Sequence, residues 1–291
     1  MAELTKGRKA LAWPVALGVV VLVAGLGALG MWRLPGPAAG AAHPKLGLFV
    51  RGERPSAVEA LATTLGVNAQ VMTVYADGPD WTSFGTPPAT SLQLLLGVGA
   101  VNPTQATTIG QTLVATGHAH AIIRIMWEMN GNWFPWGVQA MSAARYIAVY
   151  RAAERAFAGV PGNHFQYVWN VNAGTAEPGR AEFDTYPGDA YVSDIGLDVY
   201  AYNRSLSAGA HNSDIPPVMA FAADHDKPTS FPEWGVNGLD APGFISYVAS
   251  VVKNPANHVI LQAYFSDGNN TITRFPRAEV EYTREFSGAN S

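Results

Sequence analysis

Residues 121–127 read AIIRIMW and residues 142–157 read SAARYIAVYRAAERAF, and this segment decides the fold. The first run is short, apolar and rich in β-branched side chains, which is typical of a buried strand. In the second run apolar side chains recur at helical spacing, which is typical of an amphipathic helix. The segment therefore predicts a strand followed by a helix, the repeating unit of an α/β protein.

The same unit recurs on both sides of this segment. Eight strands are predicted, at Leu46–Val50, Gln70–Tyr75, Leu92–Val98, Ala121–Trp127, Phe165–Trp169, Ile195–Tyr200, Thr229–Phe231 and Val259–Tyr264. Helices are predicted between them at Pro55–Leu65, Thr104–Thr116, Ser142–Phe157 and Gly243–Val252. Eight alternating units predict a single (β/α)8 barrel. An open doubly wound sheet is the alternative, but neither a G-x-G-x-x-G after the first strand nor a Walker A sequence is present to support it.

The composition excludes several classes of function. The 291 residues carry a formal net charge of −4, so a basic face for binding nucleic acid is not expected. The absence of Cys excludes a disulfide framework, thiolate metal sites and a Cys nucleophile. Charged residues make up only 14% of the chain, against about 25% in ordinary globular proteins.

Part of this charge deficit lies near the N-terminus. The run Ala10–Trp32 has no charged residue, and as a helix it would be about 35 Å long, enough to cross a bilayer. Basic residues at 6, 8 and 9 precede it, which favours a cytoplasmic N-terminus and a barrel outside the cytoplasm. We therefore expect a single-pass protein of the cell membrane. A cleaved signal peptide, with small residues at 39–41, is the alternative and would give a secreted protein.

The expected domain organisation follows from these runs. Residues 1–9 form a basic cytoplasmic tail, residues 10–32 the transmembrane helix or signal, and residues 33–44 a linker rich in Pro, Gly and Ala. Residues 45–291 form the barrel domain. This domain carries 14 Lys and Arg against 21 Asp and Glu, a net of −7. The membrane is therefore an expected partner through the N-terminal helix, whereas nucleic acid is not.

Two glutamates follow predicted strands. In a (β/α)8 barrel the active site is built at the carboxyl ends of the strands. Glu128 follows the fourth strand and Glu233 the seventh, and both stand in apolar and aromatic sequence. A facing pair of carboxylates, one protonated and one ionised, is what glycoside hydrolysis requires. We therefore predict Glu128 and Glu233 as a catalytic pair.

Aromatic residues at the strand ends add to this prediction, because indole and phenol rings suit the apolar faces of sugars. Residues predicted to contact substrate are Trp127, Asn130, Trp133, Trp136, Trp169, Tyr200, Trp234 and Tyr264. Arg124 points to the same side as Glu128 by strand alternation. We expect it to hold a carboxylate ionised or to touch substrate, and a buried ion pair is the alternative.

Three stretches resemble glycoside hydrolase family 26. Residues 127–136, WEMNGNWFPW, resemble its acid/base segment; residues 186–200 resemble the segment leading into its sixth strand; and residues 232–235, PEWG, resemble its nucleophile segment. That family includes endo-β-1,4-mannanases, β-1,3-xylanases and mixed-linkage glucanases, and belongs to the (β/α)8 clan of retaining glycosidases.

The resemblance implies individual roles. Glu128 would be the general acid/base, Glu233 the nucleophile, and Tyr200 a hydrogen-bond donor that orients Glu233. Trp169 would line the cleft and Tyr264 would floor the pocket. One residue departs from the family, which usually has His directly before its acid/base, where this chain has Trp127.

Together these features predict a retaining β-glycoside hydrolase, endo-acting on an extracellular polysaccharide of the β-mannan type or a related β-glycan. The alternatives are a membrane-tethered, non-catalytic carbohydrate-binding barrel and a transglycosylase that serves exopolysaccharide production. The chemistry requires no metal and no organic cofactor. His118 and His120 stand before the fourth strand, away from the expected site, and are not interpreted as metal ligands.

Overall fold

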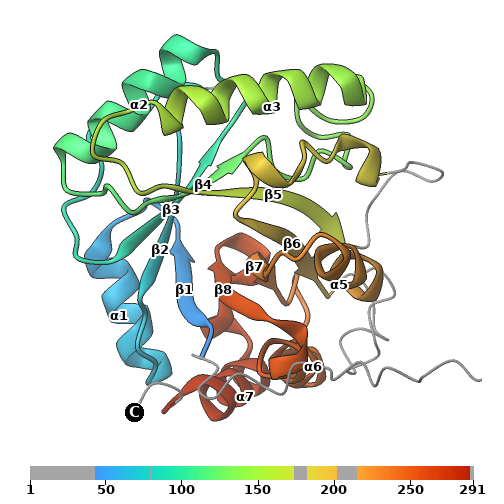
Figure 1. Cartoon of the computed structure of the whole chain (residues 1–291). Coiled ribbons are helices and arrows are strands. Elements are labelled where there is room, and N and C mark those ends of the chain that lie inside the picture. Colours follow the sequence, from blue (N-terminus) through green and yellow to red (C-terminus); the bar gives the residue numbers. More distant parts are fainter. Residues whose placement is uncertain (1–42, 79, 174–181, 202–214, 289–291) are drawn as a thin grey trace, which may run out of the picture. The chain divides into compact units, whose positions relative to one another are not determined.

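The computed structural model describes residues 43–78, 80–173, 182–201 and 215–288. Eight parallel strands form a closed barrel in chain order, with β8 paired to β1 (Figure 1). The strands are β1 (Lys45–Val50), β2 (Val71–Tyr75), β3 (Gln93–Val98), β4 (Ile122–Ile125), β5 (Gln166–Ala173), β6 (Asp194–Tyr200), β7 (Thr229–Gly235) and β8 (Val259–Ser266). The predicted barrel is confirmed, and the doubly wound sheet is excluded because the sheet closes.

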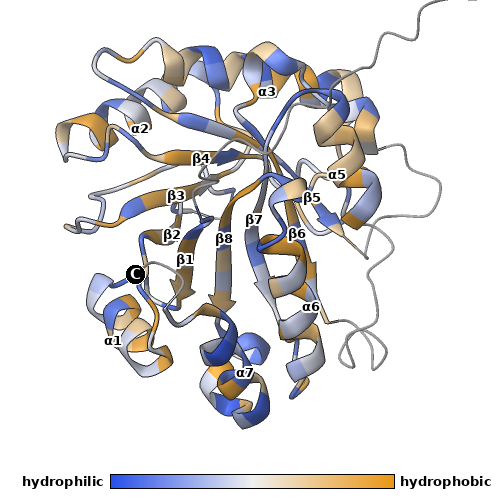
Figure 2. Cartoon of the chain, turned by 60° about the horizontal axis from the view of Figure 1, so that its bottom comes forward, coloured by the Kyte–Doolittle hydropathy of each residue, from blue (hydrophilic) through white to orange (hydrophobic). Residues whose placement is uncertain are grey.

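Helices cover the outside of the barrel (Figure 1). They are α1 (Pro55–Leu65), α2 (Pro103–Ala115), α3 (Ala143–Ala158), α5 (Ile215–Asp224), α6 (Pro242–Val252) and α7 (Pro276–Phe286). Short 3-10 helices are η1 (Glu182–Thr185), η2 (Asp189–Tyr191), η3 (Pro255–Asn257), η4 (Gly268–Asn270) and η5 (Ile272–Arg274). Figure 2 shows that the helices carry both hydrophilic and hydrophobic residues, as expected of helices with one covered face. The sequence analysis did not predict α5 and α7.

Local signals fix the starts of the helices that flank β4. At α2 the side chain of Asn102 accepts a hydrogen bond from the backbone of Gln105, and the Gln105 side chain accepts one from the backbone of Asn102. This capping box satisfies donors that the first helical turn leaves free. At α3 the Ser142 side chain accepts a hydrogen bond from the backbone of Arg145. Both helix starts are therefore specified by residues next to them in sequence.

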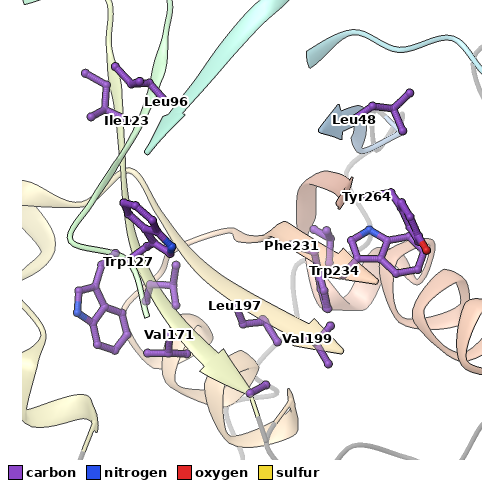
Figure 3. Packing of buried hydrophobic residues seen from close by; sticks show 14 of the residues in the cluster. Leu48, Leu96, Ile123, Trp127, Val171, Leu197, Val199, Phe231, Trp234 and Tyr264 are labelled. Atoms are coloured by element: carbon purple, nitrogen blue, oxygen red, sulfur yellow. The ribbon is translucent and has the colours of Figure 1, made fainter. Parts of the chain in front are cut away.

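Apolar side chains pack on both faces of the barrel sheet. Inside, one layer consists of Val71, Leu95, Ile122, Val168, Leu261 and Ala263. Outside, a much larger cluster joins the strands to the helices, and Figure 3 shows part of it. Alternate residues of a strand face opposite sides of the sheet. Only the inward-facing residues near the carboxyl ends of the strands can therefore contribute side chains to a site inside the barrel mouth.

Residues 1–42 lie outside the described part of the chain, so the predicted tail, transmembrane helix and most of the linker lie there too. Among the described helices, none combines the length and the apolar character needed to cross a membrane.

Candidate active site

Three carboxylates meet at the carboxyl end of the barrel. Glu233 belongs to β7, Asp198 to β6, and Glu128 follows β4. One carboxylate oxygen from each lies within 4.8 Å of the other two. Glu128 and Glu233 also line a pocket of about 290 Å³, together with Trp133, Asn172, Tyr200, Asn237 and Asn270. The two glutamates predicted from the sequence therefore share one pocket.

The chain leaves β4 in an unusual conformation that directs Glu128 over the barrel. Met126 and Glu128 have positive φ angles, 48° and 51°, in the region that non-glycine residues rarely adopt. The backbone N–H of Glu128 donates to the carbonyl oxygen of Asn170 at 2.8 Å, which ties this turn to β5. Strained backbone of this kind persists where the surrounding structure holds it, often at functional sites.

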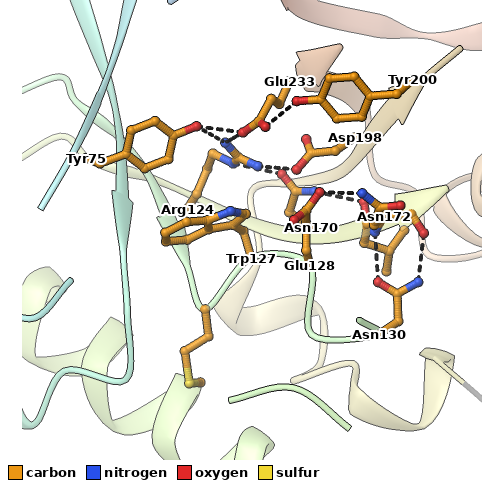
Figure 4. Close-up of polar contacts among 12 residues, drawn as sticks. Tyr75, Arg124, Trp127, Glu128, Asn130, Asn170, Asn172, Asp198, Tyr200 and Glu233 are labelled. Carbon is orange, nitrogen blue, oxygen red and sulfur yellow. Dashed lines mark hydrogen bonds and ion pairs between the residues drawn. The ribbon is translucent and has the colours of Figure 1, made fainter. Parts of the chain in front are cut away.

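Glu233 accepts hydrogen bonds at both carboxylate oxygens (Figure 4). Tyr200 donates to Oε1. Tyr75 donates to Oε2 at 2.6 Å, and Nη1 of Arg124 donates to the same oxygen at 3.1 Å. An ionised carboxylate is purely an acceptor, so two phenols and one guanidinium suit an ionised Glu233 and fix its orientation.

Arg124 connects four strands from the centre of the barrel. Its Nε donates to Oδ1 of Asn170 at 2.9 Å, and its guanidinium pairs with both Asp198 and Glu233. The side chain is fully buried. The predicted contact with a carboxylate is therefore found, as a buried ion pair, and the contact with substrate stays a prediction. Because the guanidinium lies between two carboxylates, it offsets their mutual repulsion.

Glu128 lies in a different environment from Glu233. Nδ2 of Asn172 donates to Oε1, and Nε1 of Trp133 donates to Oε2 at 2.8 Å. Burial, and then the nearby charge of Glu233, raise the pKa of Glu128 to about 7, although these hydrogen bonds and Arg124 oppose the rise. A carboxyl group with this pKa is partly protonated near neutral pH, as a general acid must be.

Asn130 and Asn172 form a paired amide support below Glu128 (Figure 4). Oδ1 of Asn130 accepts from the backbone N–H of Asn172, and its Nδ2 donates to the backbone carbonyl of Asn172, both at 2.8 Å. Asn130 is fully buried. The prediction that it touches substrate is wrong, because both ends of its amide are bonded to the β5 backbone.

The indoles next to Glu128 divide into two kinds. Trp133 lines the pocket and is 44% exposed. Trp127 and Trp136 are buried, with ring centroids 5.1 Å apart, and Nε1 of Trp136 donates to the carbonyl oxygen of Trp127. Trp127 also packs against the ring of Tyr75 at 5.3 Å. Trp127 and Trp136 therefore support the site from behind, and the prediction that they contact substrate is wrong.

Three further aromatic residues lie outside the barrel wall, so their predicted substrate contacts are also wrong. Trp169 packs against Phe221 of α5, at a centroid distance of 5.8 Å. Trp234 and Tyr264 pack against each other at 5.0 Å and against Tyr282 of α7, and Figure 3 shows the first two together. The physical reason is strand alternation: Trp169 and Trp234 each adjoin an inward-facing residue of the site and therefore face the helices.

Several residues of the site were missed by the sequence analysis. They are Tyr75, Asn170, Asn172, Asp198, Asn237 and Asn270. Asp198 precedes Tyr200 by two positions, so alternation puts both on one face, and Asn170 and Asn172 have the same spacing. These spacings were available in the sequence, but amides carry no charge that singles them out.

Known proteins resemble this chain in sequence and in fold. The model of glycosyl hydrolase family 26 matches residues 111–223. The resemblance to glycosyl hydrolase family 26 is confirmed. The matched range contains Glu128, Arg124 and Tyr200 but ends before Glu233.

A curated relative extends the match. Endoglucanase H of Acetivibrio thermocellus is 28% identical over 182 residues, which cover 58% of this chain and 20% of the relative. The chain therefore matches about a fifth of the length of that protein. This relative and the family model together support a glycoside hydrolase.

Solved structures of family 26 enzymes share the fold. The β-mannanase BoMan26A of Bacteroides ovatus superposes with a TM-score of 0.61 at 13% identity, covering 85% of this chain and 89% of the other. A modular endo-β-1,4-mannanase of Cellulomonas fimi gives 0.61 at 16% identity, covering 86% and 74%. At such identities the likeness establishes the barrel fold alone.

Proposed function

We propose that this protein is a retaining β-glycoside hydrolase in which Glu128 is the acid/base and Glu233 the nucleophile. The observation that carries the proposal is the approach of their carboxylate oxygens to within 4.8 Å in one pocket. Retaining glycosidases hold the two carboxyl groups about 5–5.5 Å apart, whereas inverting enzymes need about 6.5–9.5 Å to admit a water. The geometry therefore supports double displacement.

In the first displacement, the protonated carboxyl of Glu128 gives its proton to the glycosidic oxygen. The ionised carboxylate of Glu233 attacks the anomeric carbon, and the bond from that carbon to the leaving oxygen breaks. Tyr75, Tyr200 and Arg124 hold the attacking carboxylate in place. The product of this step is a glycosyl ester on Glu233, and the leaving sugar departs with the proton.

In the second displacement, Glu128 acts as a base. It takes a proton from water while the water oxygen attacks the anomeric carbon, and the ester bond to Glu233 breaks. Two inversions give net retention, and both glutamates return to their starting protonation states. If a sugar hydroxyl replaces water in this step, the same site performs transglycosylation.

The substrate class follows from the pocket and the relatives. Trp133 offers an exposed indole for stacking, and the amides of Asn172, Asn237 and Asn270 offer donors and acceptors for sugar hydroxyls. We propose endo action on a polysaccharide of the β-mannan type or a related β-glycan, with support from the mannanases and the endoglucanase to which the chain is similar.

We also propose that the barrel is tethered to the outer face of the cell membrane by residues 10–32. The support is the uncharged length of Ala10–Trp32 and the basic residues before it. Membrane fractionation of the full chain tests this. We expect the activity in the membrane fraction, and we expect detergent, but not high salt, to release the protein from it. Activity in the medium, on a chain shortened at residues 39–41, would show signal cleavage instead.

The proposed activity is tested by incubating the full chain in detergent with β-mannan, mixed-linkage β-glucan and β-xylan. We expect shortened oligosaccharides from at least one glycan, and none from the Glu233→Ala variant of equal thermal stability. Binding to a glycan without turnover by the wild type would overturn the enzyme assignment and identify a non-catalytic binding barrel. Products longer than the substrate would indicate transglycosylation.

A further inference from the structure

Trp133 is the one exposed side chain that contacts the acid/base within the described pocket. Its Nε1–H donates to Oε2 of Glu128 at 2.8 Å, although its side chain is 44% exposed at the rim. The other pocket residues that hydrogen-bond the two glutamates, Asn172 and Tyr200, are both buried. A hydrogen bond therefore joins the buried carboxyl of Glu128 to the exposed ring of Trp133.

The two donors to Glu128 differ in how firmly they are held. Asn172 is buried, and Asn130 clamps its backbone N–H and carbonyl at 2.8 Å each (Figure 4). Among the described residues, no side chain clamps Trp133 in this way. Its ring contacts Phe134 at a centroid distance of 6.4 Å, lies over Gly131 and lines the pocket. The donor to Oε1 is therefore buried, whereas the donor to Oε2 lies at the exposed rim of the pocket.

The position of this indole depends on Gly131. A Cβ built on Gly131 would lie 2.3 Å from Cζ2 of Trp133 and 2.4 Å from Cη2. Real Cβ atoms do not approach so closely, so any side chain at this position would push the indole away from Glu128. The backbone of Gly131 is not in the left-handed region, so its lack of a side chain matters here for space alone.

We propose that Trp133 is a displaceable positioning residue: a sugar entering the leaving-group side of the pocket moves its indole N–H off Oε2 of Glu128 and frees that oxygen to deliver the proton. This inference rests on the proposed function of Glu128. The general acid adjoins the leaving group by definition, and Trp133 lies on the pocket side of that acid.

A displaceable donor affects the pKa of Glu128 differently before and after substrate binds, which a fixed donor would not. A hydrogen bond donated to a carboxylate stabilises its ionised form, so the Trp133 bond lowers the pKa of Glu128 in the free enzyme. Displacing the indole removes this effect in the enzyme–substrate complex. The acid therefore becomes a weaker acid, and more fully protonated, only after the substrate has bound.

The Trp133→Phe variant separates the two cases, because it keeps a stacking ring and removes the donor. The pH dependence of kcat/KM reports the free enzyme, and that of kcat reports the complex. We expect the alkaline limb of kcat/KM to move up by about one pH unit in the variant, while the alkaline limb of kcat stays where it is in the wild type. A shift in both profiles would show a bond that persists with substrate and would overturn the proposal, as would a shift in neither.

Two further single variants test whether the shift comes from the bond between Trp133 and Glu128. Gly131→Ala should displace the same indole and give the same kcat/KM shift, and the double variant should add nothing to either single one. Trp81→Phe is the matched control. In the described part of the chain, Trp81 packs against Trp127 and Phe134 near the site and forms no hydrogen bond with Glu128. We expect its profiles to match the wild type. Additive shifts in the double variant, or a shift in the control, would contradict the assigned bond.

A measurement without substrate distinguishes failure of this proposal from failure of the proposed function. Carbon-13 NMR of the Glu-labelled full chain follows the titration of the Glu128 carboxyl, assigned by its loss in Glu128→Gln. We expect its midpoint to rise in Trp133→Phe, whether or not any glycan is hydrolysed. An unchanged midpoint would overturn the role of Trp133, whereas an inactive wild type with a raised midpoint would overturn only the proposed activity.

Discussion

Glu128 and Glu233 are the same type of side chain in the same pocket, but their surroundings differ. Glu233 receives two phenols and a buried guanidinium, so its neighbours include a positive charge. Of the side chains that the structure describes, an amide and an indole, both neutral, donate to Glu128, and burial, followed by the charge of Glu233 beside it, raises its pKa to about 7. This difference in donors matches the different roles that we propose for the two glutamates.

Removing either carboxylate should have the largest effect on hydrolysis. We expect Glu233→Ala to lose hydrolysis by on the order of 10⁴-fold or more, and Glu128→Ala to lose about 10²–10⁴-fold on the natural glycan. With azide and an aryl β-glycoside that needs no acid, the products should differ, because azide replaces the nucleophile in one variant and water in the other. NMR should show an α-glycosyl azide from Glu233→Ala and a β-glycosyl azide from Glu128→Ala. The same anomer from both would contradict the assigned roles.

Removing the buried cation should destabilise the nucleophile side. Arg124→Met leaves Asp198 and Glu233 close together without their guanidinium, and breaking a buried ion pair costs about 3–5 kcal/mol. Urea unfolding at neutral pH measures this loss, and we expect it to shrink at acidic pH, where the carboxyls protonate. The matched control is Arg284→Met on the exposed face of α7, which should change stability little. Equal effects of the two substitutions would show that the central ion pair is not important for the fold.

Removing one donor from Glu233 sharpens the comparison. Tyr75→Phe deletes the bond to Oε2 but keeps the ring that packs on Trp127. Because a hydrogen bond to a charged group contributes about 1.5–3 kcal/mol, we expect kcat to fall about 10–100-fold with KM little changed. Steady-state kinetics at several pH values measure this effect. An unchanged kcat would mean that Tyr75 does not hold the nucleophile.

The raised pKa of Glu128 should also affect stability, although less than it affects activity. The pKa is about 7 in the folded protein against an ordinary value of 4.5, so between these pH values the folded state binds more protons than the unfolded state. Stability contributed by this group is therefore lost as pH rises from about 4.5 to about 7. We expect Glu128→Gln to be more stable than the wild type at pH 8, with the difference vanishing near pH 4, as thermal unfolding would measure. A less stable variant at pH 8 would show that burial does not raise this pKa.

The sequence predicted the barrel and singled out the two glutamates that share one pocket, because both depend on local patterns. Apolar β-rich runs identified all eight strands, and Glu128 and Glu233 stand out in a chain with few charges. Trp133 and Tyr200 line the pocket as expected, but the other predicted aromatic residues do not, because composition does not say which face of a strand a ring occupies. Trp234 shows the difficulty: the pairing of β7 with β8 shifts register between Phe231 and Trp234, so counting alternate residues from the strand start becomes unreliable there.

The residues behind the site were missed for a different reason. Tyr75 reaches Glu233 from a strand 158 positions earlier in the chain, and only closure of the barrel brings them together. Arg124 was expected to touch either a carboxylate or substrate, and its buried ion pairs with Asp198 and Glu233 confirm the first of these contacts. Such contacts depend on which strands are neighbours across the barrel.

The central claim is that Glu128 and Glu233 act by double displacement, and the stereochemistry of the first product tests it most directly. Proton NMR of the wild-type reaction, recorded within the first minutes on a β-linked oligosaccharide, distinguishes the anomers before they equilibrate. The account predicts that the new reducing end appears first as the β-anomer and only later converts to the equilibrium mixture. If the α-anomer appears first, a single displacement by water takes place, and the roles assigned to the two glutamates are wrong.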